Sequence, residues 1–465
     1  MRKTKIVCTI GPATSEYETL KKLAASGMNV ARLNMSHGDF TWHGKVINAI
    51  KRINERTNFS VAIMLDTKGP EIRTGDLKNA LTIKTGDEFI FTTRNLKEYP
   101  ENTVSISYDS FHKDVSKGDR ILIDGGMLVF KVIGKKGRDV VTQCIDGGGL
   151  TSRRHVNIRG KSANLPSITK KDWEDIEFGI TNGIDFIALS FVKNKNSVVE
   201  LREYLEKKNS HVKVISKIES AEASENIEEI VAHSDGVMVA RGDLGSELPV
   251  EEVPVIQDEI IITCRKYSKP VIVATQLLES MMVNPTPTRA EVSDIAGAVR
   301  AKSDAIMLSG ETAVGKYPIK CVEVMDKVAK RIEKGIKREF YIPEEDPKSD
   351  TEIVRSAAQI SNNLKVKGIL VFTRRGYMAS LLAGARPSAP IFAFTNTSYV
   401  RRRLNIYWNT FSHRIDFSKD PEKTIDRAFE VLKENENLEE GDRIIVLSDI
   451  LVKDEFVQTI QYREV

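Results

Sequence analysis

Two side chains of opposite charge, Lys217 and Glu219, stand at the end of an otherwise apolar, strand-like run, KVISKIESAE (Lys213–Glu222). Successive side chains of a strand point to opposite faces, so Lys217 and Glu219 share one face and Ile218 lies on the other. Burying an ion pair contributes little to stability, because desolvation offsets the attraction. The pair therefore indicates a site that handles charged ligands rather than a structural ion pair.

A second carboxylate, Asp243, follows the next apolar run, GVMVAR. Glu219 and Asp243, at the ends of neighbouring strands, would together suit a divalent metal ion such as Mg2+ or Mn2+, which prefers oxygen ligands. No cluster of Cys and His in the sequence suggests zinc. For Asp243 alone, a helix cap within GDLGSE is an open alternative. Arg32 offers a planar fork of donors for an anionic group.

Eight short apolar runs, rich in β-branched residues, account for the positions of these side chains. Most are almost continuously apolar, as expected of parallel strands covered on both faces, and helix-like segments lie between most of them. Ser15–Gly27 opens with a Ser/Glu pair in capping spacing, and Thr288–Ala301 begins on a cap residue. This alternation predicts a (β/α)8 barrel and favours it over an open doubly wound sheet. The runs are Lys5–Ile10, Asn29–Asn34, Val61–Asp66, Phe186–Phe191, Lys213–Glu219, Gly236–Arg241, Pro270–Thr275 and Ala305–Ser309.

Polar residues gather at the C-terminal ends of these runs, where barrels of this kind carry their reactive groups. A strand that exits into water turns polar, which explains one or two such positions but not a ring holding both cations and carboxylates. The ring comprises Arg32, Asn34, Ser36, Asp66, Thr67, Lys68, Ser190, Lys217, Glu219, Arg241, Asp243, Thr275, Ser309 and Glu311.

The alternation of strands and helices breaks twice. After Val61–Asp66 the chain contains alternating runs such as DEFIFTT and turn signals such as DGG, typical of a small all-β domain. Near Tyr341–Asp350 it becomes polar and carries prolines, as linkers do, and a smaller α/β pattern follows. The sequence therefore predicts a barrel over 1–68 and 166–340, an inserted small all-β domain over 69–165 and a C-terminal α/β domain over 341–465; the resemblance described below implies that these are the catalytic barrel, a β-barrel lid domain and a regulatory domain.

The 465-residue chain has a net charge of +4, from 69 basic and 65 acidic side chains, which argues against nucleic acid or a membrane surface as partner. Its four cysteines are far apart, as in reduced intracellular proteins. The N-terminus lacks the apolar core of a signal peptide, and no stretch is long enough to span a membrane. We therefore expect a cytoplasmic protein, or a plastid protein if a transit peptide was removed.

Seven longer motifs follow one another along nearly the whole chain: ARLNMSHGD, LDTKGPEIRTGD, SKIES, VMVARGDLG, ATQLLESM, PTRAEVSDIAGAV and LSGETAVGKYP. Together they closely resemble the pyruvate kinase family. The resemblance implies transfer of the phosphoryl group of phosphoenolpyruvate to ADP, giving pyruvate and ATP in the final step of glycolysis. RRHVNIRG (Arg153–Gly160) replaces the commoner KGVNLPG and resembles the plastid and cyanobacterial branch.

The resemblance also implies metal ligands. Glu219 and Asp243 would bind the Mg2+ (or Mn2+) that holds phosphoenolpyruvate. Glu71, in KGPEIR, is associated with K+ dependence in the family, so we predict activation by K+. The K+ ligands would be oxygens of Asn34, Ser36, Asp66 and Thr67.

Roles in the reaction follow from the resemblance by position. Arg32 would hold the phosphoryl group in transit, and Lys217 would stabilise its charge. Thr275 would lie beside the substrate carboxylate, near the face where the enolate is protonated; the proton donor is open, and Thr275 acting through water is one candidate. An inserted domain over the reactive face would exclude water. The substrate-binding set would be Arg32, Ser190, Lys217, Gly242, Asp243 and Thr275, and the nucleotide-binding set Arg73, Arg154 and Asn34.

In the C-terminal domain, LVFTRRGYMASLL is typical of a strand, a polar turn and a helix. Thr373, Arg374 and Arg375 would bind an effector phosphate at the start of that helix, with solvated surface arginines as the alternative. The resemblance implies a homotetramer under allosteric control. The Ser/Thr-rich phosphate loop of members regulated by fructose bisphosphate is missing, so a different phosphate effector is favoured.

Two other interpretations remain. A related barrel enzyme that acts on phosphoenolpyruvate or oxoacids, such as an aldolase or lyase, would cleave carbon–carbon bonds with a metal and without ADP. A catalytically silent scaffold or effector-binding relative would be expected to have lost some of Arg32, Lys217, Glu219 and Asp243, and all four are present. ATP-forming turnover distinguishes the three.

Overall fold

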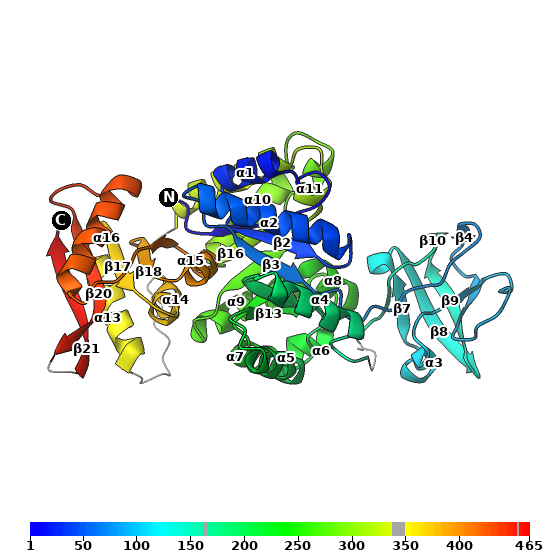
Figure 1. Cartoon of the computed structure of the whole chain (residues 1–465). Coiled ribbons are helices and arrows are strands. Elements are labelled where there is room, and N and C mark those ends of the chain that lie inside the picture. The colour runs from blue at the N-terminus through cyan, green and yellow to red at the C-terminus, as the bar shows by residue number, and fades with distance from the viewer. Residues whose placement is uncertain (161–164, 337–348, 453–454) are drawn as a thin grey trace.

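Three groups of elements make up the molecule, with the barrel between the other two (Figure 1). A computed structural model of the chain describes residues 1–160, 165–336, 349–452 and 455–465. The strand-rich group inserted after β3 stands on one side of the barrel, and the C-terminal group stands on the other (Figure 1). Among the described helices, none combines the length and the apolar character needed to cross a membrane.

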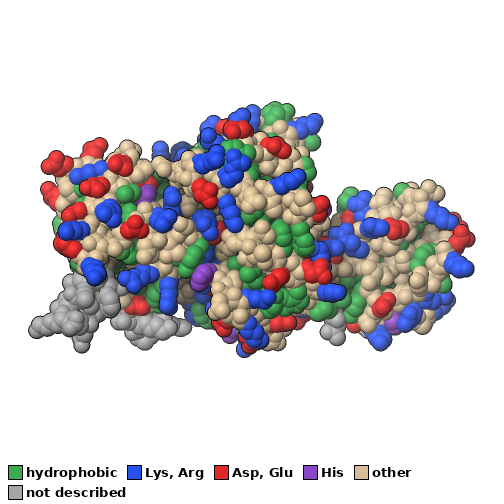
Figure 2. Space-filling view, viewed as in Figure 1, with side chains coloured by type: hydrophobic (Ala, Val, Ile, Leu, Met, Phe, Trp, Pro, Cys, Tyr) green, Lys and Arg blue, Asp and Glu red, His purple; other side chains and the backbone are tan. Residues whose placement is uncertain are grey.

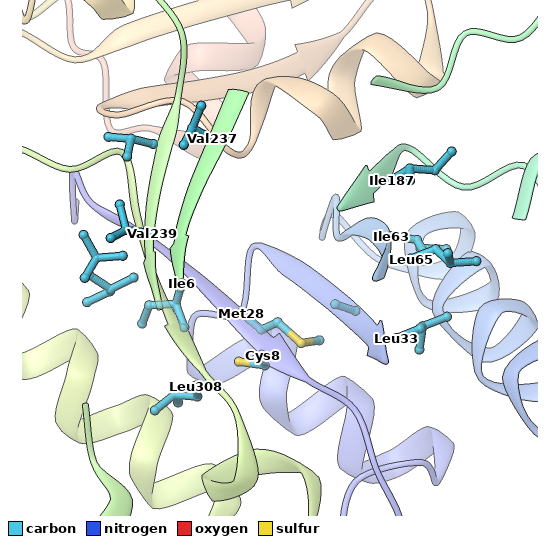
Figure 3. Close-up of a cluster of buried hydrophobic side chains, with 14 of the residues drawn as sticks. Ile6, Cys8, Met28, Leu33, Ile63, Leu65, Ile187, Val237, Val239 and Leu308 are labelled. Carbon is cyan, nitrogen blue, oxygen red and sulfur yellow. The ribbon is translucent and has the colours of Figure 1, made fainter. Parts of the chain in front are cut away.

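The central group is a closed barrel of eight parallel strands, which confirms the predicted fold class. Its strands are short and almost wholly buried, because helices cover the outside and side chains fill the inside. Figure 3 shows part of the outer layer, where Leu33, Ile63 and Leu65 point away from the barrel interior. The strands are β1 (Lys5–Thr9), β2 (Val30–Asn34), β3 (Ala62–Asp66), β12 (Phe186–Leu189), β13 (Lys213–Ile218), β14 (Gly236–Ala240), β15 (Val271–Ala274) and β16 (Ala305–Leu308).

The barrel helices begin at well-defined residues. Thr288 and Glu291 form a capping box at the start of α10, as predicted. The predicted cap of the first helix was wrong: α1 begins after Glu16, which makes no side-chain cap bond. The reason is a turn closed by Gly11 and Thr14, which ties the preceding segment to the barrel and delays the helix. The helices are α1 (Tyr17–Ser26), α2 (Phe40–Arg56), α4 (Lys170–Thr181), α5 (Lys195–Lys207), α6 (Ala221–Glu225), α7 (Ile227–His233), α8 (Arg241–Glu247), α9 (Glu252–Lys266), α10 (Arg289–Arg300), α11 (Gly310–Ala313) and α12 (Pro318–Glu333), with a short 3-10 turn, η2 (Glu279–Met282).

The group inserted between β3 and β12 has its own core, built around the edge-on and tilted rings of Phe89, Phe91 and Phe130. Six strands form one sheet in the order β11-β7-β8-β9-β5-β6, and β4 pairs with β10. The elements are β4 (Leu81–Ile83), β5 (Glu88–Thr92), β6 (Thr103–Ser105), α3 (Phe111–Asp114), β7 (Arg120–Ile123), η1 (Asp124–Gly126), β8 (Leu128–Lys136), β9 (Asp139–Asp146), β10 (Gly148–Leu150) and β11 (Val156–Ile158).

The C-terminal group is a five-stranded sheet in the order β19-β18-β17-β20-β21, in which β21 alone is antiparallel to its neighbour. Most of the predicted linker, Tyr341–Asp350, lies outside the described residues. The elements are α13 (Ser349–Leu364), β17 (Gly368–Phe372), α14 (Tyr377–Gly384), β18 (Ile391–Thr395), α15 (Ser398–Leu404), β19 (Thr410–Arg414), α16 (Pro421–Asn435), β20 (Arg443–Val452) and β21 (Glu455–Glu464).

This C-terminal group closes the floor of the barrel, meaning the end where its strands begin. Ile406 is fully buried and packs with the inward-facing side chains of the barrel. Arg386 donates to both carboxylate oxygens of Asp304, just before β16, at 2.8 and 2.6 Å. Arg402 pairs with Asp185, just before β12. The opposite end of the barrel, its mouth, is thereby the end left for ligands.

Candidate active site

The buried ion pair that drew attention in the sequence belongs to a larger network at the mouth. Lys217 Nζ lies 2.8 Å from Glu219 Oε1 and 3.1 Å from Asp66 Oδ1. Arg32 Nε donates to the other oxygen, Asp66 Oδ2, at 2.6 Å. Asp66 ends β3, so one carboxylate holds cations from β2 and β13 on either side of it. Burial opposes its ionisation, but the two cations hold the pKa of Asp66 below its ordinary value.

Hydroxyl groups fix the two cations in place. Lys217 Nζ donates to Ser190 Oγ at 2.7 Å, and Ser190 Oγ donates to the backbone oxygen of Thr67 at 2.6 Å. Arg32 donates to Thr9 Oγ1 at 2.8 Å. The sequence analysis did not predict Thr9 as a site residue. Its position as a polar residue at the end of the first apolar run could have indicated it. These bonds restrict both cations to one orientation before any ligand arrives.

Carboxylates outnumber cations at the mouth. Asp66 and Glu219 are buried and Asp243 is half-buried, and the cations beside them among the described residues are Lys217 and Arg32. Burial, with the nearby charge of Asp243, raises the pKa of Glu219 to about 7 against the opposing effect of Lys217. Burial likewise raises the pKa of Asp243. Uncompensated buried carboxylates of this kind fit a divalent cation.

The donor set also limits how a metal would be held. No cluster of three or more His, Cys, Asp and Glu side chains suited to a metal occurs among the described residues. Glu219 Oε2 already accepts a hydrogen bond from the backbone N–H of Phe191 at 2.6 Å. Two carboxylates would therefore share the ion with substrate and water oxygens, as Mg2+ sites commonly do.

Asp243 lies on a helix and not at a strand end. Helix α8 begins at Arg241 after Ala240, and Asp243 is in its first turn. The N-cap is Ala240, without a side-chain cap bond, so the alternative of Asp243 as a cap does not hold. The helix N-terminus faces the mouth with its partial positive charge.

The oxygen donors expected to bind K+ come from two neighbouring strand ends. Asn34 and Asp66 are register partners in the pairing of β2 with β3. Asn34 Oδ1 accepts a hydrogen bond from the backbone N–H of Ser36 at 3.1 Å, and Ser36 is exposed. Thr67 follows Asp66 directly. The four residues are thus on adjacent segments and supply only oxygen ligands, which suit a hard cation.

Thr275 is held in a strained backbone conformation. Its φ is +71°, in the left-handed region that β-branched residues avoid. Its Oγ1 accepts a hydrogen bond from the N–H of Gly242 at 3.0 Å, and its backbone oxygen accepts one from Arg241 at 2.6 Å. Arg241 in turn donates hydrogen bonds to both carboxylate oxygens of Asp294, at 2.6 and 2.7 Å. Asp294 was missed, because it comes from helix α10 and no strand-end pattern marks it.

Two of the predicted nucleotide residues, Arg73 and Arg154, lie where the inserted group joins the barrel, whereas the third, Asn34, ends strand β2. Arg73 donates to Glu71 at 2.8 Å, and Arg154 pairs with Asp124 of the inserted group at 2.9 Å. The ring of His155 is 6.4 Å from that of Phe191, the residue bonded to Glu219. Cations from the inserted group therefore border the mouth.

The predicted effector residues are in a different part of the molecule, between β17 and α14. Thr373 Oγ1 accepts a hydrogen bond from the N–H of Gly376 at 2.8 Å, which fixes the turn before α14. Arg374 and Arg375 are exposed. The structure does not bring these residues together with those of the mouth.

Fixed cations set beside surplus carboxylates can neutralise a phosphoryl group while it moves between two oxygens. Phosphoryl transfer depends on positioning and charge stabilisation more than on covalent chemistry by the protein. Fold and site together define a phosphoryl-transfer enzyme built on a (β/α)8 barrel.

Comparisons with known proteins agree. Two family profiles match, "Pyruvate kinase, barrel domain" over residues 1–322 and "Pyruvate kinase, alpha/beta domain" over residues 351–458. The chain is 47% identical to pyruvate kinase isozyme A, chloroplastic, of Ricinus communis, over 97% of this chain and 81% of that protein. It is 43% identical to pyruvate kinase of Geobacillus stearothermophilus, over 97% of this chain and 78% of that protein. A crystal structure of a pyruvate kinase from Cryptosporidium parvum superposes with a TM-score of 0.91 at 36% identity, over 99% of this chain and 96% of that one.

The chain therefore belongs to the pyruvate kinase family. It transfers the phosphoryl group of phosphoenolpyruvate to ADP, giving pyruvate and ATP. Its relatives include plastidial enzymes, among them plastidial pyruvate kinase 2 of Arabidopsis thaliana at 50% identity over 96% of this chain and 78% of that protein.

Proposed function

We propose that Lys217 and Arg32 carry the phosphoryl transfer, with Arg32 binding the group and Lys217 neutralising its charge in transit. The supporting observation is the fixed position of Lys217 Nζ among oxygens of Asp66, Ser190 and Glu219, at 3.1, 2.7 and 2.8 Å. A buried cation held in advance stabilises a developing negative charge without reorganising.

Thr275 and Gly242 serve the second half of the reaction, in which an enolate takes up a proton. Thr275 Oγ1 accepts a hydrogen bond from the N–H of Gly242, and its own O–H donates to no acceptor within the described part of the chain. The strain at Thr275 supports a positioning role beside the substrate carboxylate. The immediate proton donor is water oriented by this hydroxyl, and the inserted domain excludes other water.

Glu219 and Asp243 would hold Mg2+ or Mn2+, which when bound supplies positive charge against the substrate oxygens. The test is a thermal-shift titration with Mg2+ in the absence of substrate. Wild-type protein should be stabilised by the ion, and Asp243→Asn should lose most of that stabilisation. Equal stabilisation of both proteins would contradict the assignment.

Asn34, Ser36, Asp66 and Thr67 would hold K+. Glu71 supports this dependence, because Arg73 and Lys68 lie at 2.8 and 3.6 Å from it and keep it charged. Although burial opposes ionisation, Arg73 holds the pKa of Glu71 below its ordinary value. Turnover in choline chloride should be far below turnover in KCl, and equal rates would remove K+ from the proposal.

Arg73, Arg154 and Asn34 would contact the nucleotide. Arg154→Gln should raise the KM for ADP and leave that for phosphoenolpyruvate nearly unchanged. A matched control is Arg153→Gln, whose side chain is exposed and paired with Asp76. If both KM values rise equally, Arg154 acts on the position of the inserted domain instead.

Each of the three groups of elements would have its own function. The barrel, over 1–68 and 166–340, would carry catalysis; the lid, over 69–165, would exclude water; and the domain over 341–465 would be regulatory. A homotetramer is supported by exposed apolar residues on α9, where Val255 and Ile262 are 61% and 57% exposed. Residues seven apart share a helix face, and such a face favours burial in a subunit contact. Mass photometry would test it, and a monomer at micromolar concentration would refute it.

Thr373, Arg374 and Arg375 would bind a phosphorylated effector.

The protein would work in the cytoplasm or in the plastid interior. The plastidial names of several relatives support the plastid. A coupled assay for pyruvate, with phosphoenolpyruvate, ADP, Mg2+ and K+ as the starting mixture, tests the activity itself. If no pyruvate forms, the protein is a catalytically silent scaffold. If the protein cleaves carbon–carbon bonds without ADP, it is a lyase.

A further inference from the structure

The inserted group joins the barrel through a narrow junction, where acidic and basic side chains gather on the face that Figure 2 shows. One carboxylate inside this junction is not used in the reaction proposed above. It belongs to Glu247, which ends helix α8 and is 7% exposed. The cavity beside it has a volume of about 50 Å3, whereas small-molecule sites typically have about 300–1,000 Å3. The function of Glu247 therefore depends on the protein groups that it contacts.

Glu247 accepts hydrogen bonds from two other segments of the chain. Its Oε2 accepts one from the backbone N–H of Ala221 at 3.0 Å. Ala221 is the first residue of α6, two residues after Glu219. The side-chain amide of Asn157, in β11 of the inserted group, donates to the same carboxylate. One side chain thus joins the end of α8, the segment that follows β13 and the inserted group.

Two of the joined segments carry the carboxylates proposed to hold the divalent metal. Asp243 lies in the first turn of α8, four residues before Glu247, so the two side chains lie one turn apart on the same helix face. Glu219 stands just before α6. The inserted group also approaches α8 closely, because a β-carbon on Gly125 of η1 would lie 3.4 Å from Ser246 Oγ. A shift of α8 would therefore change both the distance between the two carboxylates and the contact with the inserted group.

The position of Glu247 is unfavourable for a charged group. Burial raises its pKa to about 7, against the hydrogen bonds from Ala221 and Asn157, and the charges of Asp243 and Glu219 raise it further. A carboxylate buried near two others lowers the stability of the fold unless its oxygens are well bonded. Both of its partners are donors, so the two oxygens serve to hold two segments in place.

We propose that Glu247 is a positioning residue, which sets the distance between Glu219 and Asp243 and couples metal binding to the position of the inserted group through Asn157. This inference rests on the proposal that Glu219 and Asp243 hold Mg2+ or Mn2+. Helix α8 has seven residues, so a displacement of Asp243 is carried to Glu247 and from there to β11. Residues that orient metal ligands commonly contribute about 10–100-fold to metal affinity.

A thermal-shift titration of the full-length protein with Mg2+, in the absence of substrate, tests the effect on the two carboxylates. Glu247→Leu has a side chain of similar size without the hydrogen bonds, and it should bind Mg2+ about tenfold more weakly or worse. Glu247→Gln keeps an acceptor for Ala221. Its amide can donate to Asn157 Oδ1, which is buried and has no partner among the described residues, so this variant should recover most of the loss. The matched control is exposed Glu251→Gln, which should bind Mg2+ as wild type does.

Hydrogen exchange in β11 (Val156–Ile158) tests the coupling to the inserted group. Mg2+ should slow exchange of these backbone amides in wild-type protein. In Asn157→Ala the slowing should be lost, while the affinity for Mg2+ should stay near that of wild type, because the bond from Ala221 to Glu247 remains. This variant tests the coupling even if Glu247→Leu does not fold.

The outcomes that would overturn the proposal are distinct. Wild-type affinity for Mg2+ in Glu247→Leu would remove the positioning role. A loss in Glu247→Gln as large as that in Glu247→Leu would remove it too, because the charge of Glu247 and not its hydrogen bonds would then act on the ion. Equal slowing of exchange in wild type and Asn157→Ala would refute the coupling. If Mg2+ does not stabilise even the wild-type protein, the metal site itself is wrong, and this inference falls with it.

Discussion

The two ends of the barrel both bury charged side chains, but they balance them differently. At the floor, Asp304 Oδ1 accepts from Arg386 and from the backbone N–H of Trp408, and Oδ2 accepts from Arg386 and from the backbone N–H of Val271. At the mouth, Asp243 is half-buried, and no hydrogen bond to its carboxylate occurs among the described residues. The protein itself supplies the donors for the buried carboxylate at the floor, and it does not do so for the carboxylate of Asp243 at the mouth.

This difference separates structural from functional charge. A planar guanidinium matches both oxygens of one carboxylate and leaves nothing for a ligand. At the mouth the cations are shared among several oxygens, and the backbone at Thr275 is strained. Burial of charge alone therefore does not mark a site; an unfilled acceptor beside a fixed cation does.

The substitution Lys217→Met gives the strongest test of the difference between the charged residues at the mouth and those at the floor. The variant should lose about 10³-fold in kcat, because a fixed cation at the developing charge is removed, and should keep most of its affinity for phosphoenolpyruvate. Steady-state kinetics and a binding titration measure the two. The control is Lys213→Met at the other end of the same strand, whose half-exposed side chain pairs with Asp235 and should not affect kcat. Near-normal kcat in Lys217→Met would refute the role.

The floor should respond in the opposite way. Arg386→Met should cost about 3 kcal/mol of stability, because Asp304 would be left buried without its partner. The kcat of the folded fraction should stay near normal. Urea denaturation and kinetics on the same sample measure both quantities. Exposed Arg374→Met should change neither, and a loss of kcat in Arg386→Met as large as that in Lys217→Met would erase the distinction between the two ends.

Asp294→Ala tests the strained residue indirectly. Without Asp294, Arg241 would no longer be held against the backbone oxygen of Thr275, and kcat should fall about tenfold through misplacement. The KM for ADP should not change. Asp294→Asn, which keeps one acceptor oxygen, should recover part of the loss. Equal effects on kcat and on melting temperature in both variants would indicate a purely structural role.

Lys5 gives an effect that depends on pH. It is buried at the floor, its Nζ donates to the backbone oxygen of Thr410 at 2.5 Å, and burial lowers its pKa to about 7. An unfolded lysine has a pKa of about 10.4, so between these values the unfolded chain binds more protons and stability rises with pH. From pH 7 to pH 9 wild type should gain about 2 kcal/mol relative to Lys5→Met. Parallel pH profiles in urea denaturation would disprove this.

The barrel was readable from the sequence because its strands are covered on both faces. In a strand such as Ala305–Leu308 (AIML), polar and apolar side chains do not alternate, because one face packs against helices and the other against the barrel interior. The shared face of Lys217 and Glu219 was readable for a related reason, since strand period alone puts them together, and they lie 2.8 Å apart.

Partners contributed by distant segments were not readable. Asp294 reaches Arg241 from a helix 53 residues away in sequence, and no local pattern records that meeting. Strand β19 at the sheet edge carries polar residues, as in Ser412–Arg414, and so lacks a continuous apolar run like that of its neighbour β18. The excess of carboxylates over cations at the mouth became visible only once three strands and a helix were placed together.

Because Ile406 packs against the inward-facing residues of the barrel, the barrel is incomplete while the chain is being synthesised. Ile406 follows the last barrel strand by about 100 residues, and ribosomes add roughly 5–20 residues per second. For several seconds after its last strand emerges, the nascent barrel therefore lacks its floor and exposes its apolar interior to water or to chaperones. A chain terminated before residue 406 would keep that exposed surface permanently and would be a candidate for aggregation rather than a smaller working enzyme.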